Sequence, residues 1–269
     1  MNGYWEGIVE KCNGRSSLMS SSQKAPLKIA KPFARSDGGL TIYLMDASPG
    51  LFGGDLQTII CRIGCNSSLY LTNQSSCKIH PSHTQELSLQ MQTFYIENGA
   101  LFEYIPEPIV PYEGSRYEGA TTLYMQTGGS AIIGEILTPG RIGRGEVFLF
   151  RKFQSTFSVY WDEQCMVWDT LVIEPMRISN RLIMGTFTHV GTLYVLSEMM
   201  NESHVVAIRK VLDSIVGIDV YAGCSALQKN GMIVRMLGNH AWRLQEVMRE
   251  CHMHIRKIIF GLEAIDIRK

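Results

Sequence analysis

The sequence has no long hydrophobic run and no excess charge of either sign. No stretch reaches the ~18 consecutive apolar residues of a membrane span, and Glu6 and Glu10 interrupt the start, where a signal peptide would be apolar. Lys and Arg together number 25, as do Asp and Glu, which excludes the charged surface of a dedicated nucleic-acid or anionic-membrane binder. We therefore expect a cytoplasmic protein with neither a nucleic-acid nor a membrane partner, whose partner is a protein or a small solute.

Closely spaced cysteine pairs are also lacking. The seven cysteines are odd in number and scattered, and none forms a C-x-x-C pair. This distribution argues against a disulfide framework and against a tetrathiolate zinc site. The sequence equally lacks a P-loop and a nucleophile elbow. We expect reduced thiols, most of them in the core, and no tightly bound cofactor.

Charged residues are scarce, whereas hydrophobic residues are plentiful. Charged residues make up 19% of the chain and hydrophobic residues 45%, against roughly 25% charged residues in an average soluble domain. This composition excludes intrinsic disorder, and 269 residues can bury a sizeable core. Because a neutral chain with few charges has little repulsion to keep it soluble, we expect poor solubility alone, or an obligate complex.

Residues 39–175 show strands and turns in succession, with almost no helical periodicity. In residues 87–91 apolar and polar side chains alternate, which predicts a strand with Leu87, Leu89 and Met91 on its dry face. Examples of the expected strands are residues 40–45, 56–63, 68–72, 87–96, 121–126, 147–152 and 157–161.

Glycine turns recur at intervals of roughly 30 to 35 residues, each ahead of a small residue and an apolar strand. Residues 63–71, 98–101 and 128–132 share this form. The period favours stacked coils over a closed barrel, although a β-sandwich also places glycine turns at irregular intervals. The predicted fold is therefore mainly β, a stacked two-sheet, β-helix-like (solenoid-like) architecture, with a few α-helices in the C-terminal third.

An amphipathic helix and a hairpin are expected in that C-terminal third. Residues 203–216 place apolar side chains on one face, behind a cap at Asn201 or Ser203. Two strands, residues 219–226 and 232–237, are joined by an Asn-Gly turn, which predicts a hairpin.

A longer helix is expected after Asn239, with apolar residues at helical spacing. We expect this apolar stripe to be covered either by the chain's own sheet or by a partner. The chain is interpreted as one domain, residues 1–269. Within it, residues 1–175 form the β-rich stack, and residues 176–269 add strands and two helices that are candidates to face a partner.

The sharpest local motif is SPGLFGGD at residues 48–55. Its Gly53-Gly54 pair permits positive φ and close backbone approach, and Asp55 fixes one carboxylate beside it. A phosphate cradle is disfavoured, because no Lys-Ser/Thr follows and the next segment is an expected strand rather than a helix. By itself the motif predicts a structural loop.

Two further motifs, EYIPEPIVP and EILTPGRIGRGE, carry carboxylates among prolines, glycines and arginines. Their charged residues are Glu103, Glu107, Glu135, Arg141, Arg144 and Glu146. A glycosidase could use Asp55, Glu103 or Glu135 as its acid and base. The competing interpretation is that the glutamates pair with the two arginines or lie in solvent.

Cysteine and histidine gather in two places. Cys77, His80 and His83 lie at three-residue intervals, and their side chains are ligand types suited to Ni²⁺ or Zn²⁺, although a solvated loop is the favoured interpretation. Residues 251–254 fall on the expected long helix, where adjacent side chains point about 100° apart and cannot share an ion. We expect Cys251 in the core and the two histidines of this group at its flank.

Several motifs together resemble the successive motifs of one known family, the urease accessory protein UreD, also called UreH. In order they are PLK to KPF (residues 26–33), SPG to GGD (48–55), LTNQS to KI (71–79), NGA to EYIP (98–106) and GR to RGEVF (140–148). Within them, the residues assigned to structure are Gly53, Gly54, Gln74, Pro106, Gly140, Arg141, Arg144, Gly145 and Glu146. The resemblance is strong from about residue 26 to 175 and loose afterwards, and Asn73 stands where the family more often has a second Thr.

The resemblance implies a non-catalytic scaffold, or chaperone, of urease maturation. Such proteins bind the accessory protein UreF, which recruits the GTPase UreG, and the assembly docks on apo-urease so that nickel reaches the buried active site. The resemblance also implies a homodimer held through the partner complex, and nickel in transit rather than tightly bound. The alternatives are a β-helix carbohydrate-active enzyme with paired carboxylates and a plain β-structured subunit.

Nickel in transit requires weak ligands, and oxygen atoms hold Ni²⁺ less tightly than Cys or His. The candidate residues are Asp55, Glu103, Glu107, Glu135 and His80. The resemblance places the carboxylates' motifs in one stacked structure, where strands distant in sequence become neighbours. Two outcomes stay open, because the carboxylates could face an internal passage or could pair with Arg141 and Arg144 and hold the sheets together.

Overall fold

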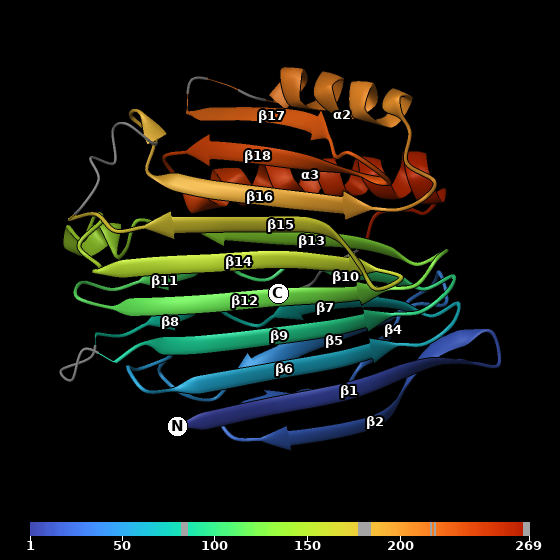
Figure 1. Cartoon of the computed structure of the whole chain (residues 1–269), viewed down its shortest axis with the longest axis horizontal. Helices are drawn as coiled ribbons and strands as arrows, with labels where there is room; N and C mark the ends of the chain where they lie inside the picture. Colours follow the sequence, from blue (N-terminus) through green and yellow to red (C-terminus); the bar gives the residue numbers. More distant parts are fainter. Residues whose placement is uncertain (82–85, 177–183, 216, 218, 266–269) are drawn as a thin grey trace.

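The structure, a computed structural model, is built from two β-sheets that face each other, with helices against the second sheet (Figure 1). It describes residues 1–81, 86–176, 184–215, 217 and 219–265. The chain passes from one sheet to the other and back, so that successive coils stack as a β-solenoid. The predicted mainly-β, two-sheet stack with helices in the C-terminal third is confirmed.

Both sheets are parallel in the middle and antiparallel at their ends. The first sheet contains, in spatial order, β15 (Gln164–Ile173), β14 (Lys152–Trp161), β12 (Arg116–Met125), β9 (Ser88–Ile96), β6 (Leu56–Ile63), β1 (Asn2–Cys12) and β2 (Arg15–Lys24). The second contains β17 (Val220–Ala226), β18 (Gly231–Gly238), β16 (His189–Leu196), β13 (Ser130–Leu137), β10 (Leu101–Tyr104), β7 (Ser68–Asn73), β5 (Leu40–Asp46) and β3 (Leu27–Ile29). Short strands join its margins, namely β4 (Phe33–Ala34), β8 (Cys77–Ile79) and β11 (Ile109–Pro111).

The glycine period marks the length of one coil. Ser68, Leu101 and Ser130 begin three neighbouring strands and pair side by side. The turns before these strands also stack, since the Gly99 N–H donates a hydrogen bond to the Gly128 carbonyl oxygen at 3.2 Å. The preference for stacked coils over a closed barrel is therefore confirmed.

Strand β9 alternates as expected, but it faces the other way. Ser88, Gln90 and Gln92 are buried between the sheets, whereas Leu89 is half-buried and Met91 is 44% exposed on the outer surface. The prediction that Leu87, Leu89 and Met91 form the inner face was wrong, because Gln90 and Gln92 find hydrogen-bond partners between the sheets. The inner face of β9 becomes apolar only further along the strand, at Phe94 and Ile96.

Strands β1 and β2 lie outside the region that we assigned to strands, and one expected strand is a loop. The edge strand β2 is serine-rich and mostly exposed, so it lacks an apolar signal, and its partner β1 precedes the region that we assigned to strands. Residues 147–151 form no strand, because Phe148 has φ of +55° and Phe150 is buried as part of a loop. Of the four apolar residues 147–150 only Phe150 is buried, and Val147 and Leu149 are exposed, so hydrophobicity here predicts neither a strand nor a continuous core segment.

The helices and the hairpin lie close to their predicted positions. Helix α2 (Glu202–Ile215) follows Asn201, whose Oδ1 accepts a hydrogen bond from the Ser203 N–H at 3.0 Å. Residue 216, the last of the expected helix, lies outside the described residues. Strands β17 and β18 pair as the expected antiparallel hairpin.

The apolar face of helix α3 (Ala241–Phe260) packs against other elements of the same chain. The helix begins after His240 rather than Asn239, and its buried Leu244, Cys251 and Ile255 belong to one core cluster with side chains of β13, β16, β18 and α2. Its apolar stripe is therefore not an exposed partner-binding surface, which removes one reason to expect poor solubility. Within the described ranges, no helix has the length and apolar character needed to cross a membrane.

The loop at residues 48–55, here called the GGD loop, is a tight turn between β5 and β6. The Asp55 carboxylate accepts a hydrogen bond from the Phe52 N–H at 2.9 Å and pairs with the N-terminal ammonium group. Gly50 has φ of +142°, and a Cβ atom there would lie 2.3 Å from the Lys78 carbonyl oxygen. Shape and local hydrogen bonds thus account for the loop.

We expect Gly54→Val to lower the free energy of unfolding by about 1–3 kcal/mol. Gly54 has φ of +85°, where side chains are disfavoured, and a Cβ atom would lie 2.9 Å from a Glu86 carboxylate oxygen. Asp55→Ala leaves the backbone free to keep its conformation and should cost less. Urea denaturation followed by circular dichroism measures both. Equal and small losses would contradict a turn that depends on backbone shape.

Candidate functional site

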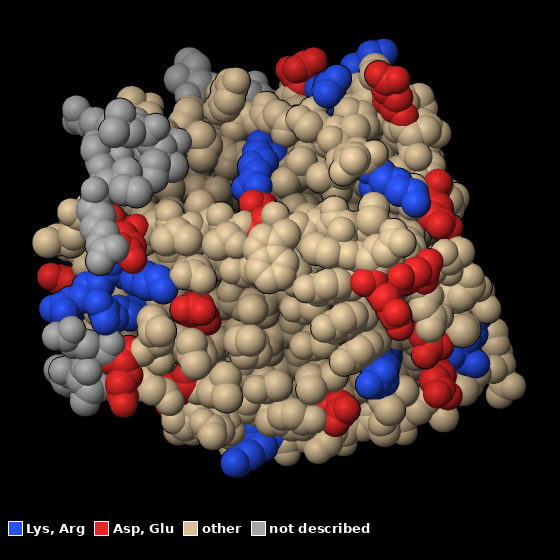
Figure 2. Space-filling view, in the orientation of Figure 1, with Lys and Arg blue, Asp and Glu red and all other residues tan. Residues whose placement is uncertain are grey.

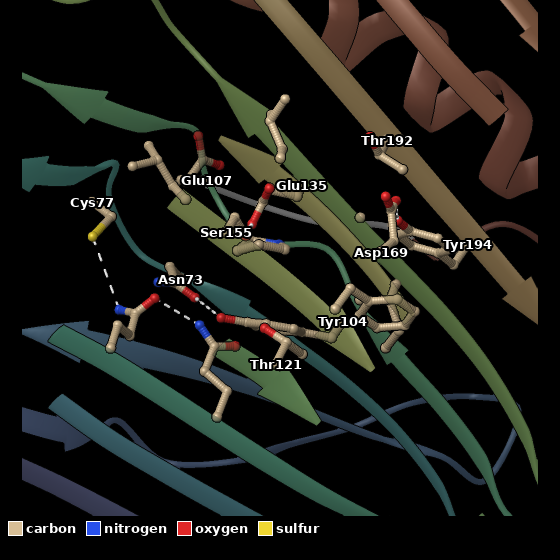
Figure 3. A pocket seen from close by; sticks show the side chains of 18 of the residues that line it. Asn73, Cys77, Tyr104, Glu107, Thr121, Glu135, Ser155, Asp169, Thr192 and Tyr194 are labelled. Carbon is tan, nitrogen blue, oxygen red and sulfur yellow. Dashed lines mark hydrogen bonds between the residues drawn. The ribbon is translucent and has the colours of Figure 1, made fainter. Parts of the chain in front are cut away.

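The two sheets enclose a small space of about 50 Å³, the inner cavity, which is lined by both polar and apolar side chains (Figure 3). This volume holds a few water molecules. Its polar lining consists of Asn73, Cys77, Gln90, Gln92, Tyr104, Glu107, Thr121, Glu135, Ser155, Asp169, Thr192, Tyr194 and Arg235. These side chains come from both sheets, so the stacking of coils brings together residues that are far apart in the sequence.

Glu135 on β13 lies in the inner cavity beside Ser155 of β14 (Figure 3). The Ser155 hydroxyl donates a hydrogen bond to Glu135 Oε2 at 2.7 Å. Burial raises the pKa of Glu135, the Ser155 hydrogen bond opposes part of that rise, and the nearby Asp169 carboxylate adds to it. A cation that entered the cavity would stabilise the charged form of Glu135.

Two more carboxylates line the inner cavity. Asp169 on β15 accepts hydrogen bonds from the Tyr194 hydroxyl and from the Arg235 guanidinium. The Arg235 side chain is 49% exposed, so this part of the lining reaches the surface. Glu107 accepts a hydrogen bond from Gln245 Nε2 of α3 at 2.9 Å. Sequence reasoning named Glu107 and Glu135 but missed Asp169 and Arg235.

A second cavity of about 30 Å³ lies next to the first and extends to the GGD loop. Asn73, Cys77 and Gln90 line both cavities. A chain of side-chain hydrogen bonds runs along them from Gln92 to Gln90 (2.6 Å), from Gln90 to Gln57 (2.9 Å) and from Gln57 to Asp46 (2.6 Å). The two glutamines at alternate positions of β9, Gln90 and Gln92, are the sequence signal that could have found this polar interior.

Glu103 lies elsewhere, in a buried ion cluster between β10 and α3. It is fully buried, and its carboxylate oxygens lie 2.5 Å from Arg256 Nη1 and 2.8 Å from His252 Nε2. Arg35 approaches the same carboxylate at 3.8 Å, and Arg256 also pairs with Asp37 at 2.8 Å. The arginines that hold Glu103 are therefore Arg35 and Arg256, not Arg141 or Arg144 as the sequence suggested.

The cluster keeps Glu103 ionised. Burial alone would raise the pKa of Glu103, but the hydrogen bond from His252 and the charges of His252, Arg256 and Arg35 outweigh burial and lower it. The expectation that both histidines flank the core of α3 was wrong for His252, which is buried against this carboxylate, whereas His254 is exposed.

His80 and Asp55 also lie outside the inner cavity. The His80 ring stacks on Phe52 at 4.3 Å and meets the edge of Tyr112 at 4.7 Å, and its Nε2 lies 3.1 Å from the Pro49 carbonyl oxygen. Asp55 closes the GGD loop as described above. Both side chains have local structural contacts.

Cys77 lines the inner cavity, and burial raises the pKa of its thiol to about 12. This raised pKa keeps the free thiol protonated at neutral pH. His83 lies outside the described residues. Within the part of the chain that the structure describes, no three Cys, His, Asp or Glu side chains are arranged to hold a metal ion.

The GRIGRGE motif, residues 140–146, forms a loop that is closed by one ion pair. Arg141 donates through Nε to Glu146 Oε2 at 2.7 Å, and its guanidinium lies 3.9 Å from the Tyr112 ring centre. This hydrogen bond lowers the pKa of Glu146. The competing interpretation of the motif, an ion pair with Arg141, is confirmed for Glu146.

The other residues assigned to structure lie at turns or at the cavity wall. Gly140 and Gly145 have positive φ, and Arg144 ends a short 3-10 helix. Gln74 is exposed, and its N–H donates to the Leu44 carbonyl oxygen at 3.0 Å. Pro106 lines the inner cavity, and Gly53 lies in the turn of the GGD loop.

Comparison with known proteins identifies the family. Residues 6–269 match the family model described as UreD urease accessory protein. The chain is 32% identical over 201 residues to a urease accessory protein UreD of Lysinibacillus sphaericus, covering 74% of this chain and 75% of the relative. It is 25% identical over 249 residues to a UreD of Bacillus cereus (91% and 90% covered) and 28% identical over 209 residues to a UreH of Helicobacter pylori (77% of each). The chain belongs to the UreD urease accessory protein family.

We expect Glu103→Gln to lower the free energy of unfolding at neutral pH by about 3 kcal/mol or more, because it leaves two arginines without their buried counter-charge. Since the folded-state pKa of Glu103 is lowered from 4.5, its ionisation stabilises the fold fully above about pH 4.5 and progressively less as pH falls below that value. Urea titrations at pH 7 and at pH 4 measure the difference, which should be smaller at pH 4.

Glu118→Gln is the matched control, because Glu118 is a surface glutamate that pairs with Lys152 at 3.4 Å. It should cost less than about 1 kcal/mol at either pH. A Glu103→Gln variant as stable as this control would show that the buried cluster contributes nothing.

Proposed function

We propose that this protein is a non-catalytic, cytoplasmic scaffold of urease maturation, which binds a UreF-type partner and, through it, a UreG-type GTPase. The assembly docks on apo-urease and assists nickel insertion, and it dimerises through the partner complex. The observation that carries the proposal is the family match from residue 6 to residue 269. The relatives named above are called accessory proteins of urease, which fits a role that supports another enzyme.

The carbohydrate-active alternative has little support in the geometry. A glycosidase needs two carboxyl groups on opposite sides of one open cleft. Glu103 is enclosed by Arg256 and His252, and Asp55 is tied to the GGD loop, whereas Glu135 lies in the inner cavity. Among the described residues, these three candidates therefore do not share a cleft.

We further propose that the inner cavity carries nickel in transit, with Glu135, Asp169 and Glu107 each serving in turn as a single transient ligand. Carboxylate oxygens bind Ni²⁺ weakly enough to release it. The cavity has room for only a few waters, so an ion inside it would exchange part of its water shell for these oxygens. Asp55, Glu103 and His80 are left out of this path, because their side chains are engaged outside the cavity.

The scaffold role predicts a stable complex on co-expression with UreF-type and UreG-type proteins. Size-exclusion chromatography and light scattering should find all three chains in one peak that contains two copies of this chain. A chain that elutes alone, with no measurable affinity for the UreF-type protein, would contradict the scaffold proposal.

Nickel transit predicts that Glu135→Gln combined with Asp169→Asn lowers the nickel content and activity of the activated urease severalfold. Asp55→Asn is the matched control, since it removes one carboxylate outside the cavity. Each variant is first assembled into the complex, and urease nickel is then measured by mass spectrometry. Full nickel loading by the double variant in an intact complex would rule these carboxylates out, and the scaffold proposal would remain.

A further inference from the structure

Three tyrosine rings and one arginine form a ladder across the outer surface of the first sheet. Arg62 of β6, Tyr95 of β9, Tyr124 of β12 and Tyr160 of β14 occupy the same register position on adjacent strands. The ring centres of Tyr95 and Tyr124 lie 5.2 Å apart, and those of Tyr124 and Tyr160 5.4 Å apart, with nearly parallel planes. The Arg62 guanidinium carbon lies 4.0 Å from the centre of the Tyr95 ring.

This ladder does not fill the core. The residues that precede each tyrosine on its strand, Phe94 and Leu123 among them, point inward and are fully buried, whereas Tyr124 is 42% exposed. Stacking between neighbouring strands stabilises the sheet. Stacking alone does not explain why the same surface forms a groove bordered by acidic residues.

The groove, here called the tyrosine groove, has a volume of about 430 Å³. Besides the ladder, its lining contains Glu97, Asp162 and Glu163, which follow the ends of β9 and β14. Figure 2 shows acidic side chains gathered at the right-hand edge of this face, while its middle has few charges. With three carboxylates and one guanidinium, the groove attracts a cation and repels a phosphate.

Two of the acidic residues of the groove lie in one tight turn. Asp162 and Glu163 form the turn between β14 and β15, and both have positive φ, at 45° and 67°. The Asp162 carboxylate accepts hydrogen bonds from the N–H and the hydroxyl of Thr127. Glu163 is exposed in the same turn. The hydrogen bonds from Thr127 therefore fix the Asp162 carboxylate, whereas the turn fixes the backbone of Glu163 and leaves its side chain exposed at the groove.

We propose that the tyrosine groove is a docking site for an arginine side chain of a partner protein. Arg62 already stacks on the Tyr95 end of the ladder, which shows that the rings accept a planar guanidinium. At the other end, Tyr160 pairs with Cys165 of β15, which has no ring to extend the ladder. An incoming guanidinium stacks on Tyr160 and pairs with the carboxylate of Glu163, an arrangement that a lysine ammonium matches less well.

The test uses a fluorescein-labelled peptide of alternating glycine and arginine as the probe, with a matched glycine-lysine peptide. The full chain is titrated in the soluble form in which it purifies, alone or in its accessory complex, and anisotropy is read at physiological salt. We expect the arginine peptide to bind severalfold more tightly than the lysine peptide. We expect Tyr160→Leu to weaken arginine binding about fivefold or more, and Glu163→Gln to weaken it by a smaller factor.

Tyr221→Leu is the matched control, because Tyr221 is a tyrosine 67% exposed on β17, in the other sheet. It should leave binding unchanged, and a thermal melt of each variant checks that the fold is intact. Equal affinity of the arginine and lysine peptides, or undiminished binding by the folded Tyr160→Leu variant, would reduce the effect to general charge attraction and overturn the proposal. Because the probe contains no urease component, this outcome is independent of the scaffold and nickel proposals.

Discussion

The ion pair between Glu103 and Arg256 determines how helix α3 covers the outer face of the second sheet. On β10, Phe102 and Tyr104 point into the space between the sheets, so Glu103 between them points toward α3. A carboxylate buried there is stable only with cationic partners. Arg256 and His252, one turn apart on α3, provide them and so fix the helix against the sheet. The helix thereby covers the second sheet, while the outer face of the first sheet stays open.

The fold could be predicted from the sequence to the extent that local patterns determine it. The recurring glycine turns predicted the spacing of the coils, and an Asn-Gly pair predicted the β17–β18 hairpin. The alternation of apolar and polar residues in β9 predicted a strand but not which face points inward, because burial of Gln90 and Gln92 depends on polar groups from other coils. Likewise, β2 was missed because a serine-rich edge strand gains its order from β1 rather than from apolar burial.

The candidate site could be predicted only in part, for a related reason. Glu107 and Glu135 were named from their motifs and do line the inner cavity, but Glu103, four residues before Glu107, belongs to a separate ion cluster. Motif membership cannot separate them, since the partner of Glu103 lies 153 residues further along the chain. Asp169 and Arg235 carried no motif and reach the cavity through strand pairing alone.

The change from parallel to antiparallel pairing at both ends of each sheet limits the size of the molecule. In the first sheet, β2 turns back along β1, and β15 turns back along β14. A parallel stack can be extended by adding further coils at its end. An antiparallel strand at the edge of the sheet interrupts this path, so no further parallel coil follows it. The exposed, serine-rich β2 offers few apolar side chains to the edge of another molecule. The protein is thus a solenoid of fixed length with its own end caps, a closed unit rather than a segment of a growing fibre.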